Sequence, residues 1–263
     1  MDRITKAVIQ ARHEREAKID GFQSSTRSWQ DRDVQVRRIE ISQEILRENR
    51  VISGEVHDAY SHAYKVLRTR VWQQMRSNGW KTLGITSANP AEGKTLTAIN
   101  LAISLAMMEV VHTVILVDLD MRHPSIHSYF GFWPESGVSD YLKEGITLAE
   151  VFVNPGVGKV VLLPSNVPVA NSSELLSSSK AQHLIQEIKA CFPSSLILFD
   201  LPPLLVTDDV LVFAPSVDAF LFVIEEGKSR TNEVTRAIDL LNDANLLGTV
   251  LNKSEESAHG YGY

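Results

Sequence analysis

One short loop in this sequence has the residues and the setting of a phosphate-binding loop. It reads Ala88-Asn-Pro-Ala-Glu-Gly-Lys-Thr95, and it stands between an apolar run at 82–86 and an apolar segment at 96–108. In such a loop the backbone N–H groups surround the phosphates, and the helix that follows directs its positive end toward them. The Lys94 side chain would contact the β- and γ-phosphates, and the Thr95 hydroxyl would bind Mg²⁺. The loop therefore predicts a site for a nucleoside triphosphate with magnesium.

Ala88 occupies the position at which the usual pattern has its first glycine. A fortuitous Gly-Lys-Thr turn is the alternative interpretation, but the apolar segments before and after the loop supply the strand-to-helix junction that the motif requires. We assign nucleotide binding to the loop, to the first helical residue and to one later strand end, namely Asn89, Pro90, Ala91, Glu92, Gly93, Lys94, Thr95, Leu96 and Asn252.

Two aspartates follow the apolar run at 113–117. Asp118 and Asp120 are two positions apart, so their side chains can point to the same side of an extended segment. One carboxylate is then able to hold magnesium while the other orients or deprotonates an incoming hydroxyl group. For Asp120, a cap of the following loop is the alternative.

A third aspartate, Asp200, ends the most apolar segment of the chain. A carboxylate is costly to bury without a counter-charge, and magnesium, bound directly or through water, supplies one. We predict that Lys94, Asp118, Asp120 and Asp200 form the catalytic set. The metal ligands are expected to be Thr95, Asp118 and Asp200.

Other polar residues near these motifs have more than one interpretation. Arg122 is placed to pair with Asp120, to reach a phosphate or to contact a neighbouring subunit. Asp208 and Asp209 have the pattern of an N-terminal helix cap. Asn252 follows an apolar strand, where it either contacts the base of a nucleotide or caps the strand end.

The apolar runs alternate with segments of helical periodicity, which is typical of a parallel sheet covered by helices on both faces. Strands are expected near 82–86, 113–118, 159–163, 195–200, 217–224 and 247–251. Helices are expected near 56–77, 94–109, 137–143, 171–177, 179–190 and 229–243. The sequence therefore predicts an α/β fold of the P-loop NTPase class, with a mostly parallel sheet and a helical N-terminal arm.

We divide the chain into a charged arm at 1–50, a P-loop domain at 51–253 and a tail at 254–263. In the arm, apolar residues at helical spacing predict an amphipathic helix from Asp2 to about Lys18, which is either solvated or docked on a partner. The tail is small and polar and ends in Gly-Tyr-Gly-Tyr, so we expect it to be mobile.

Composition limits the class and the location of the protein. The net charge of −6 argues against nucleic-acid binding, which usually needs a basic surface. A single cysteine, Cys191, excludes a disulfide framework and fits a reducing compartment. No apolar run reaches membrane-spanning length, and the N-terminus lacks the apolar core of a signal peptide. We therefore expect a cytoplasmic protein whose membrane role, if it has one, comes through a partner.

Three segments carry a resemblance to a known family. They are the loop 88–95, the segment Leu116-Val-Asp-Leu-Asp-Met-Arg122 and the segment Phe199-Asp-Leu-Pro-Pro203. Together they resemble the bacterial tyrosine kinases of capsule and exopolysaccharide loci, over about residues 55–253. The two aspartate motifs, and a phosphate loop without an early lysine, separate this family from the cell-division and partition ATPases that share its fold. The charged arm and the segment Asn171-Ser-Ser-Glu-Leu-Leu-Ser-Ser178 are most similar to autokinases of exosortase-associated loci.

The resemblance implies an ATP- and Mg²⁺-dependent protein-tyrosine kinase that regulates exopolysaccharide synthesis, export or chain length. It assigns phosphate binding to Lys94 and Thr95, assistance of the tyrosine hydroxyl to Asp118 or Asp120, and magnesium to Asp200. Family members phosphorylate a C-terminal tyrosine cluster in trans within a ring of subunits. They work with a membrane-embedded polysaccharide co-polymerase, whose cytoplasmic segment activates the kinase, and with a phosphotyrosine phosphatase. The implied location is the cytoplasm, at the inner membrane through that partner.

Two features depart from the family pattern. The helix that helps to build the ring often reads Glu-Ala-Tyr-Arg-x-Leu-Arg-Thr-Asn, and here it reads His62-Ala-Tyr-Lys-Val-Leu-Arg-Thr-Arg70. The tyrosine cluster is reduced to Tyr261 and Tyr263, the expected phosphoacceptors. These departures leave two alternatives open: a non-kinase ATPase switch that works by nucleotide-driven dimerisation, and a nucleotide-binding adaptor of the export machinery.

Overall fold

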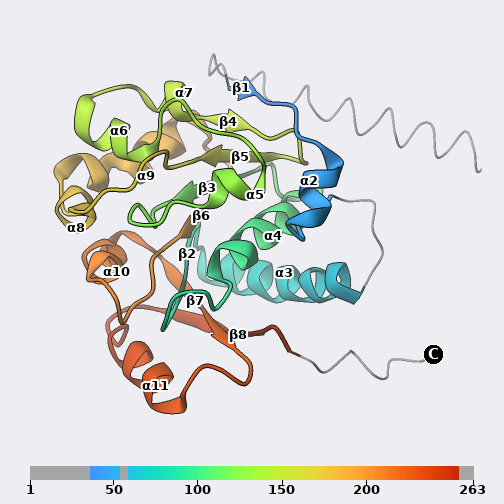
Figure 1. Cartoon of the computed structure of the whole chain (residues 1–263), viewed down its shortest axis with the longest axis vertical. Coiled ribbons are helices and arrows are strands. Elements are labelled where there is room, and N and C mark those ends of the chain that lie inside the picture. Colours follow the sequence, from blue (N-terminus) through green and yellow to red (C-terminus); the bar gives the residue numbers. More distant parts are fainter. Residues whose placement is uncertain (1–35, 54–58, 255–263) are drawn as a thin grey trace, which may run out of the picture. The chain divides into compact units, whose positions relative to one another are not determined.

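The computed structural model describes residues 36–53 and 59–254, and a sheet runs through this part of the chain (Figure 1). Within the described residues the sheet has eight strands in the order β1-β4-β5-β3-β6-β2-β7-β8. Every neighbouring pair is parallel except β4 and β5. The predicted mostly parallel sheet is confirmed. The strands are β1 (Arg37–Arg38), β2 (Thr82–Ser87), β3 (Thr113–Asp118), β4 (Val153–Asn154), β5 (Val160–Leu163), β6 (Ser195–Asp200), β7 (Ala219–Glu225) and β8 (Leu246–Asn252).

Helices cover both faces of this sheet (Figure 1). On one face α4 packs against β2, β3 and β6, and α3 lies beside α4. On the opposite face, the Phe199 ring of β6 meets the Phe213 ring of α10 edge to face, with centroids 5.0 Å apart. The helices are α2 (Gln43–Glu48), α3 (Ala59–Asn78), α4 (Lys94–Ala106), α5 (Ile126–Tyr129), α6 (Val138–Glu144), α7 (Leu148–Val151), α8 (Ser172–Leu176), α9 (Ser179–Cys191), α10 (Asp209–Phe213) and α11 (Thr231–Asp239), with a short 3₁₀ helix at Ala214–Ser216.

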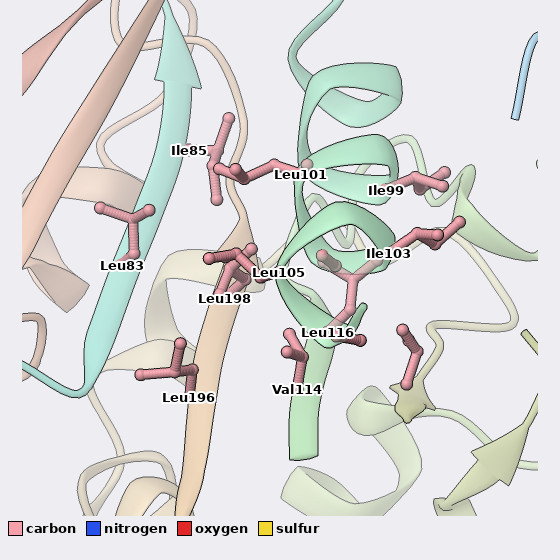
Figure 2. Close-up of a cluster of buried hydrophobic side chains, with 14 of the residues drawn as sticks. Leu83, Ile85, Ile99, Leu101, Ile103, Leu105, Val114, Leu116, Leu196 and Leu198 are labelled. Atoms are coloured by element: carbon pink, nitrogen blue, oxygen red, sulfur yellow. The ribbon is translucent and has the colours of Figure 1, made fainter. Parts of the chain in front are cut away.

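The apolar character of the central elements follows from this layered arrangement. Every residue of β2 and β6 is buried, because helices exclude water from both faces of these strands. Helix α4 is buried nearly all round, as expected for a helix held between the sheet and a second helix. Figure 2 shows its apolar side chains against those of three strands, among them Leu101, Leu105, Ile85 and Leu198. This core fixes the position of the α4 N-terminus relative to the strand ends.

Two described elements, β1 and α2, lie before residue 51, in the segment that the sequence assigned to the charged arm. Strand β1 pairs with β4 at one edge of the sheet, and α2 buries Leu46, which is 1% exposed. The charged Arg37-Arg38 pair concealed this strand in the sequence. The predicted helix from Asp2 to about Lys18 and the tail beyond Ser254 lie outside the described residues.

None of the helices in the described part of the chain combines the length and the apolarity that crossing a bilayer requires.

Candidate nucleotide site

The phosphate loop joins the end of β2 to the start of α4 and has the backbone of an anion nest. Ala91 and Gly93 both have positive φ values, 63° and 92°, on either side of Glu92. Left-handed residues that alternate in this way turn successive N–H groups toward one concave side, which favours a bound anion. Glycine suits this position for two reasons: φ is 92°, and a Cβ atom would lie 1.9 Å from the Asn252 side-chain nitrogen, so that Asn252 would have to move.

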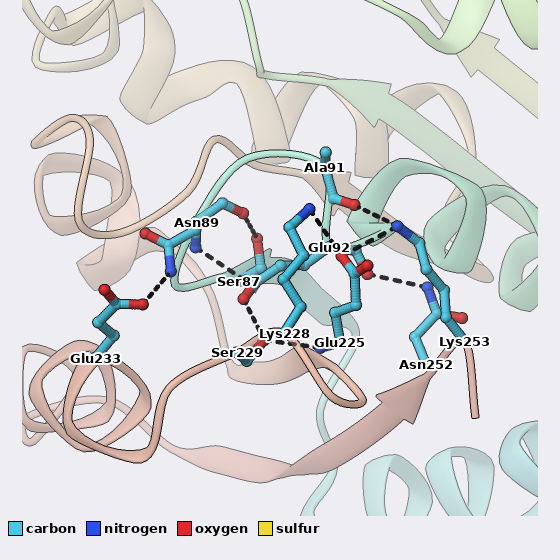
Figure 3. Close-up of polar contacts among 10 residues, drawn as sticks. All are labelled: Ser87, Asn89, Ala91, Glu92, Glu225, Lys228, Ser229, Glu233, Asn252 and Lys253. Atoms are coloured by element: carbon cyan, nitrogen blue, oxygen red, sulfur yellow. Dashed lines mark hydrogen bonds and ion pairs between the residues drawn. The ribbon is translucent and has the colours of Figure 1, made fainter. Parts of the chain in front are cut away.

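Side chains around the loop brace it from outside (Figure 3). The buried Glu92 carboxylate accepts hydrogen bonds from the Asn89 backbone N–H, at 2.8 Å, and from the Ser229 hydroxyl. The Asn89 side chain donates in turn to Glu233 of α11 at 2.9 Å. Asn252 donates from Nδ2 to the Glu92 carbonyl at 2.9 Å. The loop is thus held in its nest conformation before any anion arrives.

Asp118 and Asp200 lie side by side at the carboxyl ends of β3 and β6. They are register partners in the parallel ladder, and the Leu119 N–H donates to the Asp200 carbonyl at 2.9 Å. One Asp118 oxygen, Oδ2, accepts the N–H groups of Ser125 and Ile126, both at 3.1 Å, at the start of α5. The convergence of these two distant aspartates comes directly from strand pairing.

Most of the carboxylate oxygens of Asp118 and Asp200 have no hydrogen-bond partner among the described residues. Asp118 Oδ1 and both Asp200 oxygens are buried and receive no hydrogen bond. The Thr95 hydroxyl lies close enough to Asp200 to act to lower the pKa of that carboxyl, and it accepts a hydrogen bond from Ser125 Oγ at 3.3 Å. Buried polar oxygens without partners are uncommon in native proteins, and an ion is one usual explanation.

Burial raises the pKa of Asp200 to about 6, against the opposing attraction of Lys94. Burial also raises the pKa of Asp118 well above its usual range, and the charge of Asp200 adds to this effect. Both shifts describe the protein without a cation, and a divalent cation would reverse them. The two carboxyl groups therefore form an electrostatically costly pair that a metal would stabilise.

Lys94 forms an ion pair with an acidic residue of the site, Asp120. Its Nζ atom lies 2.5 Å from Asp120 Oδ2, and the two side chains are only 10% and 4% exposed. Burial acts to lower the pKa of Lys94, but the charges of Asp200, Asp120 and Asp118 outweigh it, and the pKa is raised. Lys94 is therefore a cation at the centre of three carboxylates.

These residues fit a magnesium ion whose coordination shell is completed by phosphate. Among the described residues, no cluster of three or more His, Cys, Asp or Glu side chains forms a metal cage. Magnesium typically uses one or two carboxylates together with water and substrate phosphates. Thr95, Asp118 and Asp200 offer such a partial shell, with three unpartnered carboxylate oxygens next to the phosphate nest.

Arg122 has a partner that the sequence did not indicate. Its Nη2 lies 3.6 Å from Asp209 Oδ1, and its Nε donates to Ser172 Oγ at 3.0 Å. Asp209 is fully buried and also accepts from the Ser172 and Thr207 hydroxyls, each at 2.5 Å. Helix α10 does begin at Asp209, but neither acid caps it by its side chain, since Asp208 at the cap makes no such bond. Asp209 instead joins the loop after β3 to α8 and α10.

The structure brings most of the predicted site together. Five predicted residues meet beside the phosphate loop, namely Lys94, Thr95, Asp118, Asp120 and Asp200. Asn252 contacts the loop through the Glu92 carbonyl. Leu96 is in the first turn of α4, with its side chain partly buried, and Pro90 is exposed. Tyr261 and Tyr263 lie outside the described residues.

Sequence reasoning missed several residues that shape this site. The α5 N-terminal amides at Ser125 and Ile126 hold Asp118, and Pro124-Ser125 was the only local signal of a helix start there. Ser229 donates to Glu92 of the loop, and Glu225, at the carboxyl end of β7, pairs with Lys253. Neither residue belongs to a sequence motif.

Comparisons with known proteins were consistent with this geometry. No protein-family model matches the chain. The chain is 30% identical over 217 residues to the Staphylococcus aureus protein named "Putative tyrosine-protein kinase CapB", covering 79% of this chain and 93% of CapB. It is 29% identical over 221 residues to the tyrosine-protein kinase YwqD of Bacillus subtilis, covering 83% and 92%.

Two solved structures lead to the same family. The kinase domain of the Escherichia coli tyrosine kinase ETK is 28% identical and superposes with a TM-score of 0.69, over 88% of this chain and 94% of that domain. The VpsO kinase domain is 29% identical, with a TM-score of 0.65 over 74% and 96%. By sequence, by fold and by the arrangement of its phosphate loop and aspartates, the chain belongs to the bacterial tyrosine-protein kinases.

Proposed function

We propose that this kinase uses ATP with Mg²⁺ to phosphorylate tyrosines, beginning with Tyr261 and Tyr263 of its own chain. One observation carries the proposal: Lys94, Asp118 and Asp200, from three separate segments, meet beside a phosphate nest with three buried carboxylate oxygens unpartnered. The ATPase switch and the adaptor that the sequence left open have no such support, whereas the chain matches the tyrosine-protein kinase YwqD over 92% of the length of YwqD.

The proposed binding roles follow from the position of each group. The loop N–H groups from Ala91 to Leu96, at the start of α4, receive the phosphates, and Lys94 turns from Asp120 to their β- and γ-oxygens. Thr95, Asp118 and Asp200 hold the metal. When bound, Mg²⁺ neutralises the charge on the β- and γ-phosphates. Asn252, against Gly93, is placed to border the nucleotide.

Asp120 is the proposed general base. Once Lys94 pairs with phosphate, the Asp120 carboxylate is free to accept the tyrosine hydroxyl proton. The tyrosine oxygen then forms a bond to the γ-phosphorus as the bond to the β,γ-bridging oxygen breaks, and ADP leaves with that electron pair. The proton passes from Asp120 to solvent. Asp118 is less suited to this role, because we assign it to the metal and two N–H groups, of Ser125 and Ile126, hold its Oδ2. Asp120 accepts one longer backbone hydrogen bond, from the His123 N–H at 3.3 Å, and its other oxygen is freed when Lys94 leaves.

The wider role that we propose rests on the family resemblance. The kinase regulates exopolysaccharide synthesis, export or chain length from the cytoplasm, at the inner membrane through a polysaccharide co-polymerase. In this proposal subunits associate in a ring, and a phosphatase reverses the modification. In α3, His62 and Thr69 lie on the exposed side, so the altered ring helix still presents a surface to a neighbour.

Phosphosite mapping tests the proposed activity. The full chain is incubated with ATP and Mg²⁺, with and without the cytoplasmic segment of the co-polymerase, and phosphotyrosines are identified by mass spectrometry. Lys94→Met serves as the inactive control and, mixed with wild type, as a substrate that reports transfer in trans. Phosphate on Tyr261 or Tyr263 supports the proposal. Unmodified tyrosines under both conditions, with ATP bound, would overturn it.

A further inference from the structure

Two carbonyl groups of the phosphate loop face away from the anion nest, and both are held by the end of β8. The Lys253 ammonium donates to the Ala91 carbonyl at 2.8 Å, and the Asn252 amide donates to the Glu92 carbonyl at 2.9 Å. Figure 3 shows both side chains reaching the loop from the same strand end. These contacts join residues that are 162 and 160 positions apart.

Lys253 also makes an ion pair that anchors it. Its Nζ lies 3.0 Å from Glu225 Oε2, and the Glu225 side chain is only 12% exposed. The Glu225 backbone N–H donates to Ser229 Oγ at 2.9 Å, and the Ser229 hydroxyl donates to the Glu92 carboxylate. These contacts connect the Ala91 carbonyl, through Lys253, Glu225 and Ser229, to the Glu92 carboxylate, so the series begins and ends on the phosphate loop. The Lys253 hydrogen bond also keeps the pKa of Glu225 below its usual range, so this acid is ionised at neutral pH.

The backbone of Lys253 is itself in an unusual conformation. Its φ is 58°, in the left-handed region that lysine seldom adopts. A strained residue of this kind persists where surrounding contacts require it, and such residues are common at functional sites. At Lys253, the left-handed turn directs the chain out of β8 while its side chain remains on the Ala91 carbonyl.

We infer that Lys253 is a positioning residue of the nucleotide site, which holds Ala91 in the left-handed conformation that the anion nest requires. The inference rests on the proposed function, because it assigns the nest to the phosphates of ATP. It adds a direct link between that nest and the root of the segment that carries Tyr261 and Tyr263. Coupling between two sites is reciprocal, so a bound nucleotide must also strengthen the contact between Lys253 and the loop.

Affinity for Mg-ADP tests the first half of the inference. Lys253→Met is expected to raise the dissociation constant about 3- to 10-fold, the loss of one partly exposed charge-assisted hydrogen bond. Lys253→Arg should restore binding. Lys228→Met is the matched control, because among the described residues Lys228 pairs with the same Glu225 oxygen, at 3.4 Å, and with no loop carbonyl.

Glu225→Gln provides a second variant that loosens Lys253 without removing it. It should weaken Mg-ADP binding in the same direction, while the KM for ATP rises in both variants and kcat toward a free tyrosine peptide is retained. If Lys253→Met binds Mg-ADP within about twofold of wild type, the inference is wrong. If wild type itself binds no Mg-ADP, the proposed function fails instead.

Limited digestion with a lysine-specific protease tests the reciprocal half. Cleavage after Lys253 releases residues 254–263 and requires the Lys253 side chain to leave Ala91 and Glu225. Saturating Mg-ADP should slow this release by about the factor that Lys253→Met costs in affinity. Cleavage after Lys189, an exposed residue of α9, should not slow in the same sample. An unchanged release rate after Lys253, with nucleotide bound, would overturn the coupling.

Discussion

Lys94 and Asp120 form a buried ion pair in which Nζ and Oδ2 are 2.5 Å apart. The lysine that the sequence assigns to the phosphates is therefore held by an acid from the loop after β3. A nucleotide must take Lys94 away from this partner, and the exchange frees Asp120 at the moment when the phosphates are in place. The pair links ATP binding to the availability of the proposed base.

The substitution Asp120→Asn is expected to separate binding from transfer. Loss of the competing carboxylate should tighten Mg-ADP binding about tenfold, since a charge-assisted hydrogen bond no longer opposes it. Phosphotransfer should fall about 10²- to 10⁴-fold, the usual contribution of a general base. Binding is measured by calorimetry and transfer by phosphotyrosine formation. Asp208→Asn, at an exposed acid, is the control. Undiminished transfer would remove Asp120 from the chemistry.

The stability of the same pair is tested by a double-mutant cycle. Lys94→Met leaves Asp120 buried without its counter-charge and should lower the free energy of unfolding by about 3 kcal/mol. In the double variant Lys94→Met/Asp120→Asn, roughly half of that loss should be recovered, because one unpaired acid is gone. Urea denaturation without nucleotide measures both. A double variant that is no more stable than Lys94→Met would contradict a buried ion pair.

Asp200 should give the nucleotide-free protein an unusual pH dependence. Its folded pKa, about 6, lies above the unfolded value of 3.8, so the folded state binds the proton more tightly. Stability is then highest below about pH 4 for this group, and is lost as the pH rises toward 6. Asp200→Asn should remove that loss and stabilise the protein at pH 7.5 by about 1–3 kcal/mol, in chelator and without nucleotide. Urea denaturation that finds this variant less stable than wild type at pH 7.5 would contradict the prediction.

Two glycines with similar backbones provide a matched test of the phosphate loop. Gly93 and Gly79 have φ values of 92° and 71°, but only at Gly93 would a Cβ atom meet a neighbour, the Asn252 amide. Gly79→Ala should cost about 1–2 kcal/mol from the left-handed conformation and leave nucleotide binding intact. Gly93→Ala should lose more stability and weaken Mg-ADP binding more than about tenfold. Thermal unfolding and calorimetry distinguish the two, and equal effects would argue against the Asn252 contact.

The parts of the fold that the sequence predicted are those set by local pattern. The buried strands β2, β3 and β6 are continuous apolar runs, and the loop before α4 carries its own motif. Because Asp118 and Asp200 end such strands, their proximity follows from parallel pairing. The family resemblance, based on the same segments, was confirmed by CapB and YwqD.

What the sequence did not predict depends on contacts between distant residues. The edge strand β1 is two arginines long and is defined only by its pairing with β4. Asp209 looked like part of a cap because Thr207-Asp208-Asp209 fits that pattern, yet its partners Arg122 and Ser172 come from other loops. No local pattern marks Lys253, whose role depends on a carbonyl 162 residues away.

The central claim is that Lys94, Thr95, Asp118 and Asp200 surround a single Mg-ATP. The most direct measurement is calorimetric titration of a non-hydrolysable ATP analogue into wild type and Asp200→Asn, each with Mg²⁺ and with chelator. Wild type should bind at least about tenfold more tightly with Mg²⁺, and Asp200→Asn should lose that gain while keeping its metal-free affinity. If Asp200→Asn kept the full magnesium enhancement, the metal would lie elsewhere and the account would be contradicted.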